Sequence, residues 1–202
     1  MKIQKLIFAA ALVLLASTSI SAQIIRRGAT AVGSSSDSEK DSHSLTIEIP
    51  QVALLDIESS TSKNISLTAT APTEAGEKVI FNQTNSDLWL NYSSIIEKNA
   101  SRNVTVQITD GDVPEGVDLS VIATQYEGNG EGAMGTVDKN AIELNDNKAQ
   151  TIIKGIGSAY TGNGAKQGHN LTYSLTQTKD AYENLKYTEN NSLTITYTLT
   201  DN

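Results

Sequence analysis

Side chains able to do acid–base chemistry near neutral pH are scarce in this sequence. Only two histidines are present, His43 and His169, although histidine is the usual general base near pH 7. His43 lies in a polar stretch, and His169 begins the run HNLTYSLT after a glycine-rich turn. No sequence signature supplies a nucleophile or a metal partner for His169, so we expect a solvated or capping side chain there.

Two glycine-containing stretches invite comparison with catalytic and phosphate-binding loops. GIGSAY flanks Ser158 with a glycine but lacks the second glycine of the G-x-S-x-G nucleophile elbow. KGIGSAYTGNGAKQGHN matches neither G-x-G-x-x-G nor G-x-x-x-x-G-K-[ST], and a strand pattern rather than a helix follows it. A long hairpin loop is favoured, and we predict no catalytic residue, no cofactor and no enzymatic activity.

Two acidic turns carry the hard oxygen ligands that calcium prefers. Neither turn fits the twelve-residue EF-hand loop, and turn-forming Asp and Asn give the same composition without a metal. We therefore predict no metal site and keep calcium as the alternative. The residues concerned are Asp110, Asp112, Glu115 and Asp118 in TDGDVPEGVD, and Glu143, Asp146 and Asn147 in ELNDN.

The N-terminus predicts an export signal. Residues 1–5 are basic, residues 6–16 are apolar, and the small residues STSISA end at Ala22, before a plausible cleavage site. The apolar run is shorter than the roughly 20 residues that a membrane-spanning helix needs. We expect residues 1–22 to be a cleaved signal peptide, with no integral membrane segment in the chain after cleavage.

Composition narrows the partners of the mature chain. Removal of Lys2 and Lys5 with the signal leaves 13 of the 15 basic residues against 23 acidic ones. This balance disfavours nucleic acid, because binding it requires basic side chains that neutralise phosphates. The chain has no cysteine, so neither a disulfide framework nor a lipoprotein anchor is available.

The mature chain divides into two regions of different composition. Residues 23–43 are polar and rich in serine and glycine, which predicts a flexible arm. Residues 44–202 alternate short β-branched runs with turn-forming stretches, which predicts a single all-β domain, an antiparallel β-sandwich. Only KDAYENLKY and the second half of DLWLNYSSIIEKNA could be helical. The predicted strands are LTIEI, ISLTAT, KVIF, DLWLNYS, NVTVQIT, VDLSVIAT, QTIIKGI, NLTYSLT and LTITYTLT.

The final run, NSLTITYTLTDN, has the strictest alternation in the chain. Threonines occupy one parity, and large apolar side chains occupy the other. Such a pattern predicts a strand with one face on the core and one face in solvent. An exposed edge of this strand would be a template for pairing. The inward positions are Leu193, Ile195, Tyr197 and Leu199.

These features together resemble bacterial fimbrial or pilus subunits and the related spore-coat-U-like secreted proteins. The resemblance implies an incomplete Ig-like, Greek-key sandwich whose last strand, residues 192–200 here, is bound by a periplasmic chaperone. It also implies that an N-terminal segment of the next subunit completes the sheet. Carried over, this donor segment is SLTIEI, with Leu45, Ile47 and Ile49 filling pockets. The missing disulfide and Pro50, which shortens the donor segment, depart from the family pattern.

We therefore expect an exported structural or adhesive cell-surface protein, of the fimbrial self-assembling type, in the periplasm or on the outer surface of a bacterium. Its partners would be copies of itself or related subunits, and a periplasmic chaperone. The alternative is a secreted glycan- or surface-binding sandwich, whose aromatic platform would comprise Trp89, Tyr126 and Tyr160. The simpler interpretation of Trp89 is a core side chain with its polar edge near water.

Overall fold

The structure, a computed structural model, describes residues 39–202. The expected signal and residues 23–38 of the expected arm lie outside the described residues. Residues 39–50 contain no helix or strand, and their side chains are exposed. Ile47–Asn202 forms one unit with its own core, and its first strand begins at Val52.

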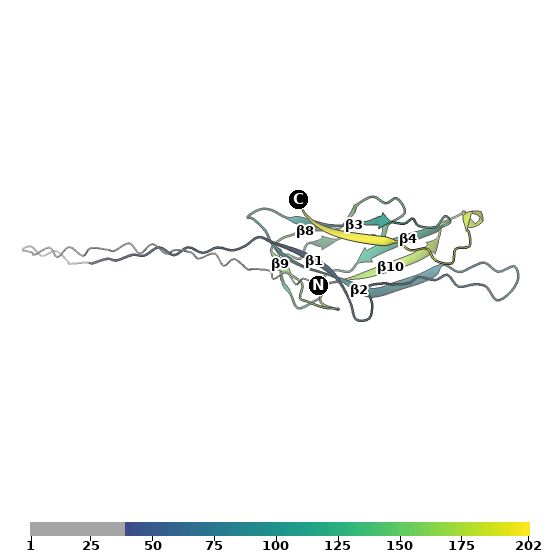
Figure 1. The fold of residues 1–202 in the computed structure, drawn as a ribbon, viewed down its shortest axis with the longest axis horizontal. Coiled ribbons are helices and arrows are strands. Elements are labelled where there is room, and N and C mark those ends of the chain that lie inside the picture. Colours follow the sequence, from purple (N-terminus) through teal and green to yellow (C-terminus); the bar gives the residue numbers. More distant parts are fainter. Residues whose placement is uncertain (1–38) are drawn as a thin grey trace, which may run out of the picture. The chain divides into compact units, whose positions relative to one another are not determined.

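The described chain is an all-β antiparallel sandwich of two sheets, which confirms the predicted fold class (Figure 1). The larger sheet has the order β5 (Glu131–Gly132), β9 (Ala159–Tyr160), β2 (Asn82–Ile95), β10 (His169–Gln177), β4 (Val117–Ala123) and β7 (Ile142–Glu143), and β1 (Val52–Ser59) pairs with β2 as well. The smaller sheet has the order β11 (Thr194–Asp201), β3 (Arg102–Asp110), β8 (Gln150–Ile156) and β6 (Thr136–Val137). Residues 88–90 of β2 pair with both β10 and β1, so β1 occupies the opposite edge of β2.

The long strands alternate between the two layers along the chain. Figure 1 shows β3 and β11 in one layer and β2 and β10 in the other. The sequence β2, β3, β4, β8, β10 and β11 therefore crosses the sandwich at every step. The stretch KDAYENLKY contributes one short 3-10 helix, Tyr182–Asn184, and β2 stays a strand to Ile95 instead of turning helical.

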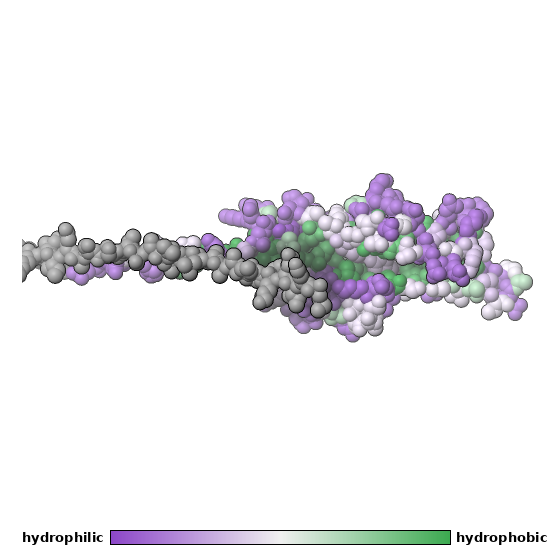
Figure 2. Space-filling view, viewed as in Figure 1, coloured by the Kyte–Doolittle hydropathy of each residue, from purple (hydrophilic) through white to green (hydrophobic). Residues whose placement is uncertain are grey.

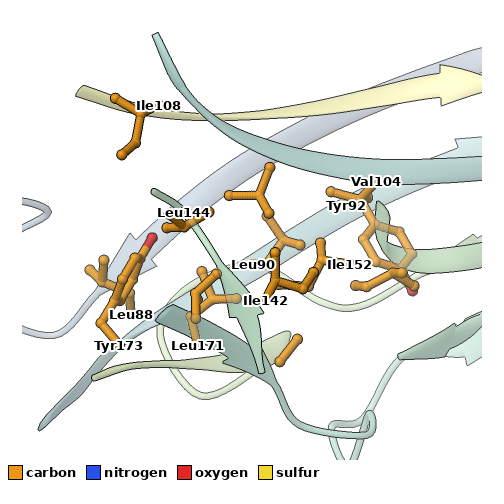
Figure 3. Close-up of a cluster of buried hydrophobic side chains, with 14 of the residues drawn as sticks. Leu88, Leu90, Tyr92, Val104, Ile108, Ile142, Leu144, Ile152, Leu171 and Tyr173 are labelled. Atoms are coloured by element: carbon orange, nitrogen blue, oxygen red, sulfur yellow. The ribbon is translucent and has the colours of Figure 1, made fainter. Parts of the chain in front are cut away.

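The core follows from period-2 alternation in the paired strands. β4 alternates buried and half-buried residues from end to end, with Leu119 and Val121 inside. Figure 3 shows side chains of the two sheets pointing toward one another across the interior. The buried apolar residues include Leu88, Leu90, Tyr92, Val104, Val106, Ile108, Ile152, Ile153, Ile156, Leu171 and Tyr173.

The last strand packs as its alternation predicts. Leu193, Ile195, Tyr197 and Leu199 all pack against the core, and each is half-buried. The Tyr197 hydroxyl lies 2.7 Å from that of Tyr173 on β10, which links the two sheets through a hydrogen bond. Burial raises the pKa of Tyr173 to about 12.

Three predicted strands are corrected by the structure, and five strands were missed: β1 and the two-residue strands β5, β6, β7 and β9. LTIEI forms no strand, because alternation needs a ladder partner and residues 45–49 have none among the described residues. ISLTAT and KVIF contribute only a single bridge between Thr70 and Ile80. β1, by contrast, was missed because VALLDIES places Leu54 on one face and Leu55 on the other, which hides the alternation.

A buried arginine ties the two sheets together at one end of the sandwich. Arg102, on β3, is 2 % exposed. Its Nε donates to Asp201 Oδ1 on β11 at 2.7 Å. Its Nη1 donates to the Val52 carbonyl on β1 and, at 3.2 Å, to Ser94 Oγ on β2. A buried cation needs such partners, so this contact fixes how the edge strands β1 and β11 meet.

The orientation of β11 is tested by two aspartate substitutions on opposite faces. Ile195→Asp places a charge against the core and should lower the free energy of unfolding by at least about 2 kcal/mol. Thr198→Asp, on the exposed face, should cost less than about 1 kcal/mol. Urea denaturation of both variants gives the comparison, and equal losses would refute the assigned register.

The Arg102 contact is tested from its exposed partner. Asp201→Ala leaves the buried guanidinium without its carboxylate and should lower the unfolding free energy by about 1–3 kcal/mol. The control is Asp110→Ala, at the other end of β3. The Asp110 carboxylate is exposed and makes no ion pair with a described residue. This control should stay within about 0.5 kcal/mol of the parent chain. Matching losses in thermal or urea unfolding would contradict a linking role.

Candidate functional site

The sandwich leaves two strand edges unpaired where its sheets meet. β11 pairs only with β3, and β1 pairs only with β2, so the other edge of each strand has no ladder among the described residues. The segment at residues 65–69, which follows β1, has no assigned secondary structure, and its Ile65 and Leu67 pack half-buried against the core. Its backbone forms no hydrogen bond with any described residue. Unpaired N–H and C=O groups on such edges are templates for an added strand.

The predicted donor side chains lie in the open. Leu45, Ile47 and Ile49 are 77 %, 76 % and 76 % exposed. Intervening Thr46 and Glu48 are polar, and Pro50, which has no backbone N–H, ends the alternation. On the domain itself, Figure 2 shows apolar groups scattered among mostly polar ones. Large apolar side chains exposed in a row are unusual unless a partner covers them.

Trp89 faces away from the core, contrary to the simpler sequence interpretation. Leu88 and Leu90 on either side of it are buried, so Trp89 has the opposite parity and lies half-buried on the outer face of the larger sheet. Its cross-strand neighbours there are Glu58 on β1 and Asn170 on β10.

An open polar cavity of about 230 Å³ lies beside Trp89. Its walls come from the loop after β4 and the loop before β10, together with the outer face of the larger sheet. The lining residues are Trp89, Thr124, Gln125, Glu127, Gly128, Lys166, Gly168 and Asn170.

The structure does not bring the predicted aromatic platform together in that cavity. Tyr126 is half-buried, and its hydroxyl donates to the Thr161 carbonyl at 2.7 Å and accepts from the Gly130 N–H. Tyr160 is 47 % exposed on β9 and does not line the cavity. Tyr126 therefore anchors a loop, and Trp89 alone contributes an aromatic wall.

His169 is fully buried and hydrogen bonded, not solvated as the sequence indicated. Its Nδ1 lies 2.9 Å from the Thr124 carbonyl, which can only accept, so Nδ1 carries a hydrogen. Its Nε2 lies 3.0 Å from the Tyr92 hydroxyl, and that hydroxyl also lies 2.6 Å from the Met134 carbonyl. Burial lowers the pKa of His169. The ring joins the start of β10 to β2 and to the loop after β4.

The acidic turns use their oxygens on neighbouring side chains. Asp118 Oδ1 accepts from Asn145 at 2.8 Å and from Thr178 at 2.7 Å. Asp112 Oδ1 accepts from Asn147 at 3.1 Å, and this hydrogen bond joins the two acidic turns. Within residues 39–202, no group of three or more His, Asp or Glu is placed to hold a metal ion. The carboxylates thus serve as turn and loop connectors.

Ser158 and His169 are not hydrogen bonded to each other. Ser158 Oγ accepts from the Ile96 N–H at 3.2 Å, whereas both His169 nitrogens contact Thr124 and Tyr92. The sequence did not reveal the buried histidine, because a lone His after a glycine-rich turn carries no periodic signal. His169 occupies the same alternate positions of β10 as the buried Leu171 and Tyr173, and this pattern was the available indication of its burial.

Comparison with protein-family models, with curated proteins and with solved structures finds no match to this chain. Among the described residues, no helix is long and apolar enough to cross a membrane.

His169 predicts a pH dependence of stability. Because its folded pKa lies below the unfolded value of about 6.5, the unfolded chain binds the extra proton as pH falls below that value. The free energy of unfolding should therefore decrease between about pH 7 and pH 5. His169→Gln should lower stability at pH 7 by about 1–3 kcal/mol and flatten the slope.

The matched control is His43→Gln, which changes the other histidine, an exposed residue. It should leave the slope of the parent chain unaltered in urea titrations across the same pH range. A slope that survives in His169→Gln and disappears in His43→Gln would contradict this assignment.

Proposed function

We propose that the protein is an exported, non-catalytic structural subunit of a bacterial cell surface, which assembles by adding a strand from one copy to a free sheet edge of the next. The observation that carries this proposal is the outer edge of β11, which pairs with no other described strand, combined with an exposed, alternating segment at residues 45–49. The export signal predicted for residues 1–22 supports the location.

The chemistry of the two partners is complementary. The outer edge of β11, a strand of eight residues, has no ladder with another described strand, and the inward side chains of β11 are only half-buried. The donor would supply backbone partners and turn Leu45, Ile47 and Ile49 toward the same interior. Ile65 and Leu67 are half-buried in a segment without a ladder to another described residue. After strand addition they would lie where the two sheets meet.

The magnitudes favour weak pairwise association. Burial of the three donor side chains is worth about 1.5–3 kcal/mol each. Loss of translational and rotational freedom costs about 4–15 kcal/mol. These ranges nearly cancel before the ladder hydrogen bonds are counted. We therefore expect a dissociation constant in the micromolar range or above in solution. High local concentration at a surface would favour assembly further.

The same edge implies a partner before assembly. An uncovered strand edge promotes aggregation during export, so we propose that a periplasmic chaperone covers β11 until another copy replaces it. Other copies of this chain, or related subunits, are the final partners.

Assembly should depend on the parity of the donor segment. Ile47→Asp in the mature chain should abolish concentration-dependent association, because a charge would enter the interior of the neighbouring copy. Its melting curve should match that of the parent chain, since Ile47 is largely exposed. Analytical ultracentrifugation over a concentration series measures the association.

Thr46→Asp is the matched control, with the same charge on the opposite parity, and it should retain association. Loss of association in both variants would show that the segment does not add as a strand. A parent chain that stays monomeric at its highest soluble concentration would contradict the proposal itself.

A further inference from the structure

We propose that the cavity beside Trp89 is a carbohydrate-binding site for a single neutral hexopyranose ring, such as the terminal residue of a surface glycan. This site is independent of the strand edges used in the proposed assembly. It lies on the outer face of the larger sheet, whereas β11 belongs to the smaller one.

The size and walls of the cavity fit one sugar ring. Its volume of about 230 Å³ is below the roughly 300–1,000 Å³ of pockets that hold drug-sized ligands. The indole of Trp89 offers an apolar surface for the C–H face of a pyranose. The remaining walls are polar, so an apolar ligand would leave them without hydrogen bonds.

Three exposed polar residues also line the cavity. The side chains of Gln125, Glu127 and Lys166 form no hydrogen bond or ion pair with any other described residue, so they are available to a ligand. A carboxylate only accepts, an ammonium only donates, and an amide does both. Sugar hydroxyls donate and accept at once, so this mixture suits them better than it suits a ligand of one charge.

Asn170 is held in place by the sheet beneath it. Its Nδ2 donates to the Ser86 carbonyl at 2.7 Å and to the Leu88 carbonyl at 3.1 Å. Its backbone N–H donates to Thr124 Oγ1 at 3.1 Å, and its carbonyl accepts from the Thr124 N–H at 2.9 Å. Two lining residues are thereby fixed before any ligand arrives, which reduces the entropy lost on binding.

The two loops that form the walls are pinned to each other and to the sheet. A Cβ on Gly128 would collide with the Gln167 carbonyl, and one on Gly168 would collide with the Leu90 carbonyl, so both positions require glycine for close backbone approach. Asn91, on β2, donates to the Gly164 carbonyl at 2.8 Å. Beneath them, His169 bonds to the Thr124 carbonyl. The cavity is therefore preformed.

Lys166 adopts a conformation that an ordinary residue avoids. Its φ is 67°, in the left-handed region where non-glycine residues are strained. Glycine would relieve this strain, yet the sequence has a lysine at this position, among the residues that line the cavity. Strain at a lining side chain is characteristic of binding sites.

Binding can be read directly, because Trp89 is the only tryptophan in the chain. The mature chain would be titrated with methyl glucoside, methyl galactoside, methyl mannoside and N-acetylglucosamine, and tryptophan emission recorded. We expect a saturable change with at least one sugar, with a dissociation constant of about a millimolar, as a ligand of this size allows.

Lys166→Gly separates a binding role from a structural one. This variant should keep or raise the melting temperature, because it removes strain, while weakening sugar binding about tenfold. Trp89→Ala, followed by saturation-transfer NMR, should abolish binding. Tyr187→Ala removes another exposed aromatic side chain, outside the cavity, and should bind as the parent does.

Three results would overturn the proposal. The first is no saturable change with any sugar at its highest soluble concentration. The second is undiminished binding by Lys166→Gly or Trp89→Ala. The third is a response to free glycine or alanine instead of sugars, which would assign the Glu127 and Lys166 pair to a zwitterion. Ile47→Asp should bind sugar normally, so failure of the assembly proposal would leave this test intact.

Discussion

Burial of the Arg102 guanidinium is the constraint on which the meeting of the two sheets depends. A cation that is 2 % exposed must find hydrogen-bond acceptors inside the protein, and Arg102 finds them on three other strands. Asp201 is bound on β11, the Val52 carbonyl on β1 and Ser94 on β2. The edges of the larger and smaller sheets are thus held together at one end of the seam.

Away from Arg102, fewer hydrogen bonds link the two sheets where their edges meet. Tyr173 and Tyr197 share one hydrogen bond across the core, while Ile65–Ala69 packs its side chains without forming a ladder. The two sheets are linked by Arg102 at one end, and the outer edge of β11 pairs with no other described strand. Such a sandwich can accept an added strand without unfolding. The outer face of the larger sheet differs, because the loops around Trp89 are fixed from below by His169 and Asn170. Assembly and ligand binding therefore use different parts of the fold.

Sequence patterns predicted the paired strands well and the unpaired segments poorly. β3, β4, β10 and β11 coincide with predicted runs because each has one face toward the core, which is what alternation reports. LTIEI alternates equally well but forms no strand, since periodicity does not reveal whether a partner exists. The site was harder still. Local alternation opposes Trp89 to its buried neighbours and groups His169 with the buried positions of β10, but the strands that lie beside them depend on register, which no local pattern specifies.

Disulfide trapping between copies tests the central claim most directly, because the chain has no native cysteine. One variant would carry Thr46→Cys, and its partner would carry a cysteine at Thr198 or Thr200 on β11, or at Glu143 on β7 as a control edge. Adjacent strands bring Cα atoms within the roughly 4.4–6.8 Å that a disulfide spans. Strand addition predicts mixed disulfides with β11 and none with β7. Equal trapping at both edges, or trapping at neither, would contradict it.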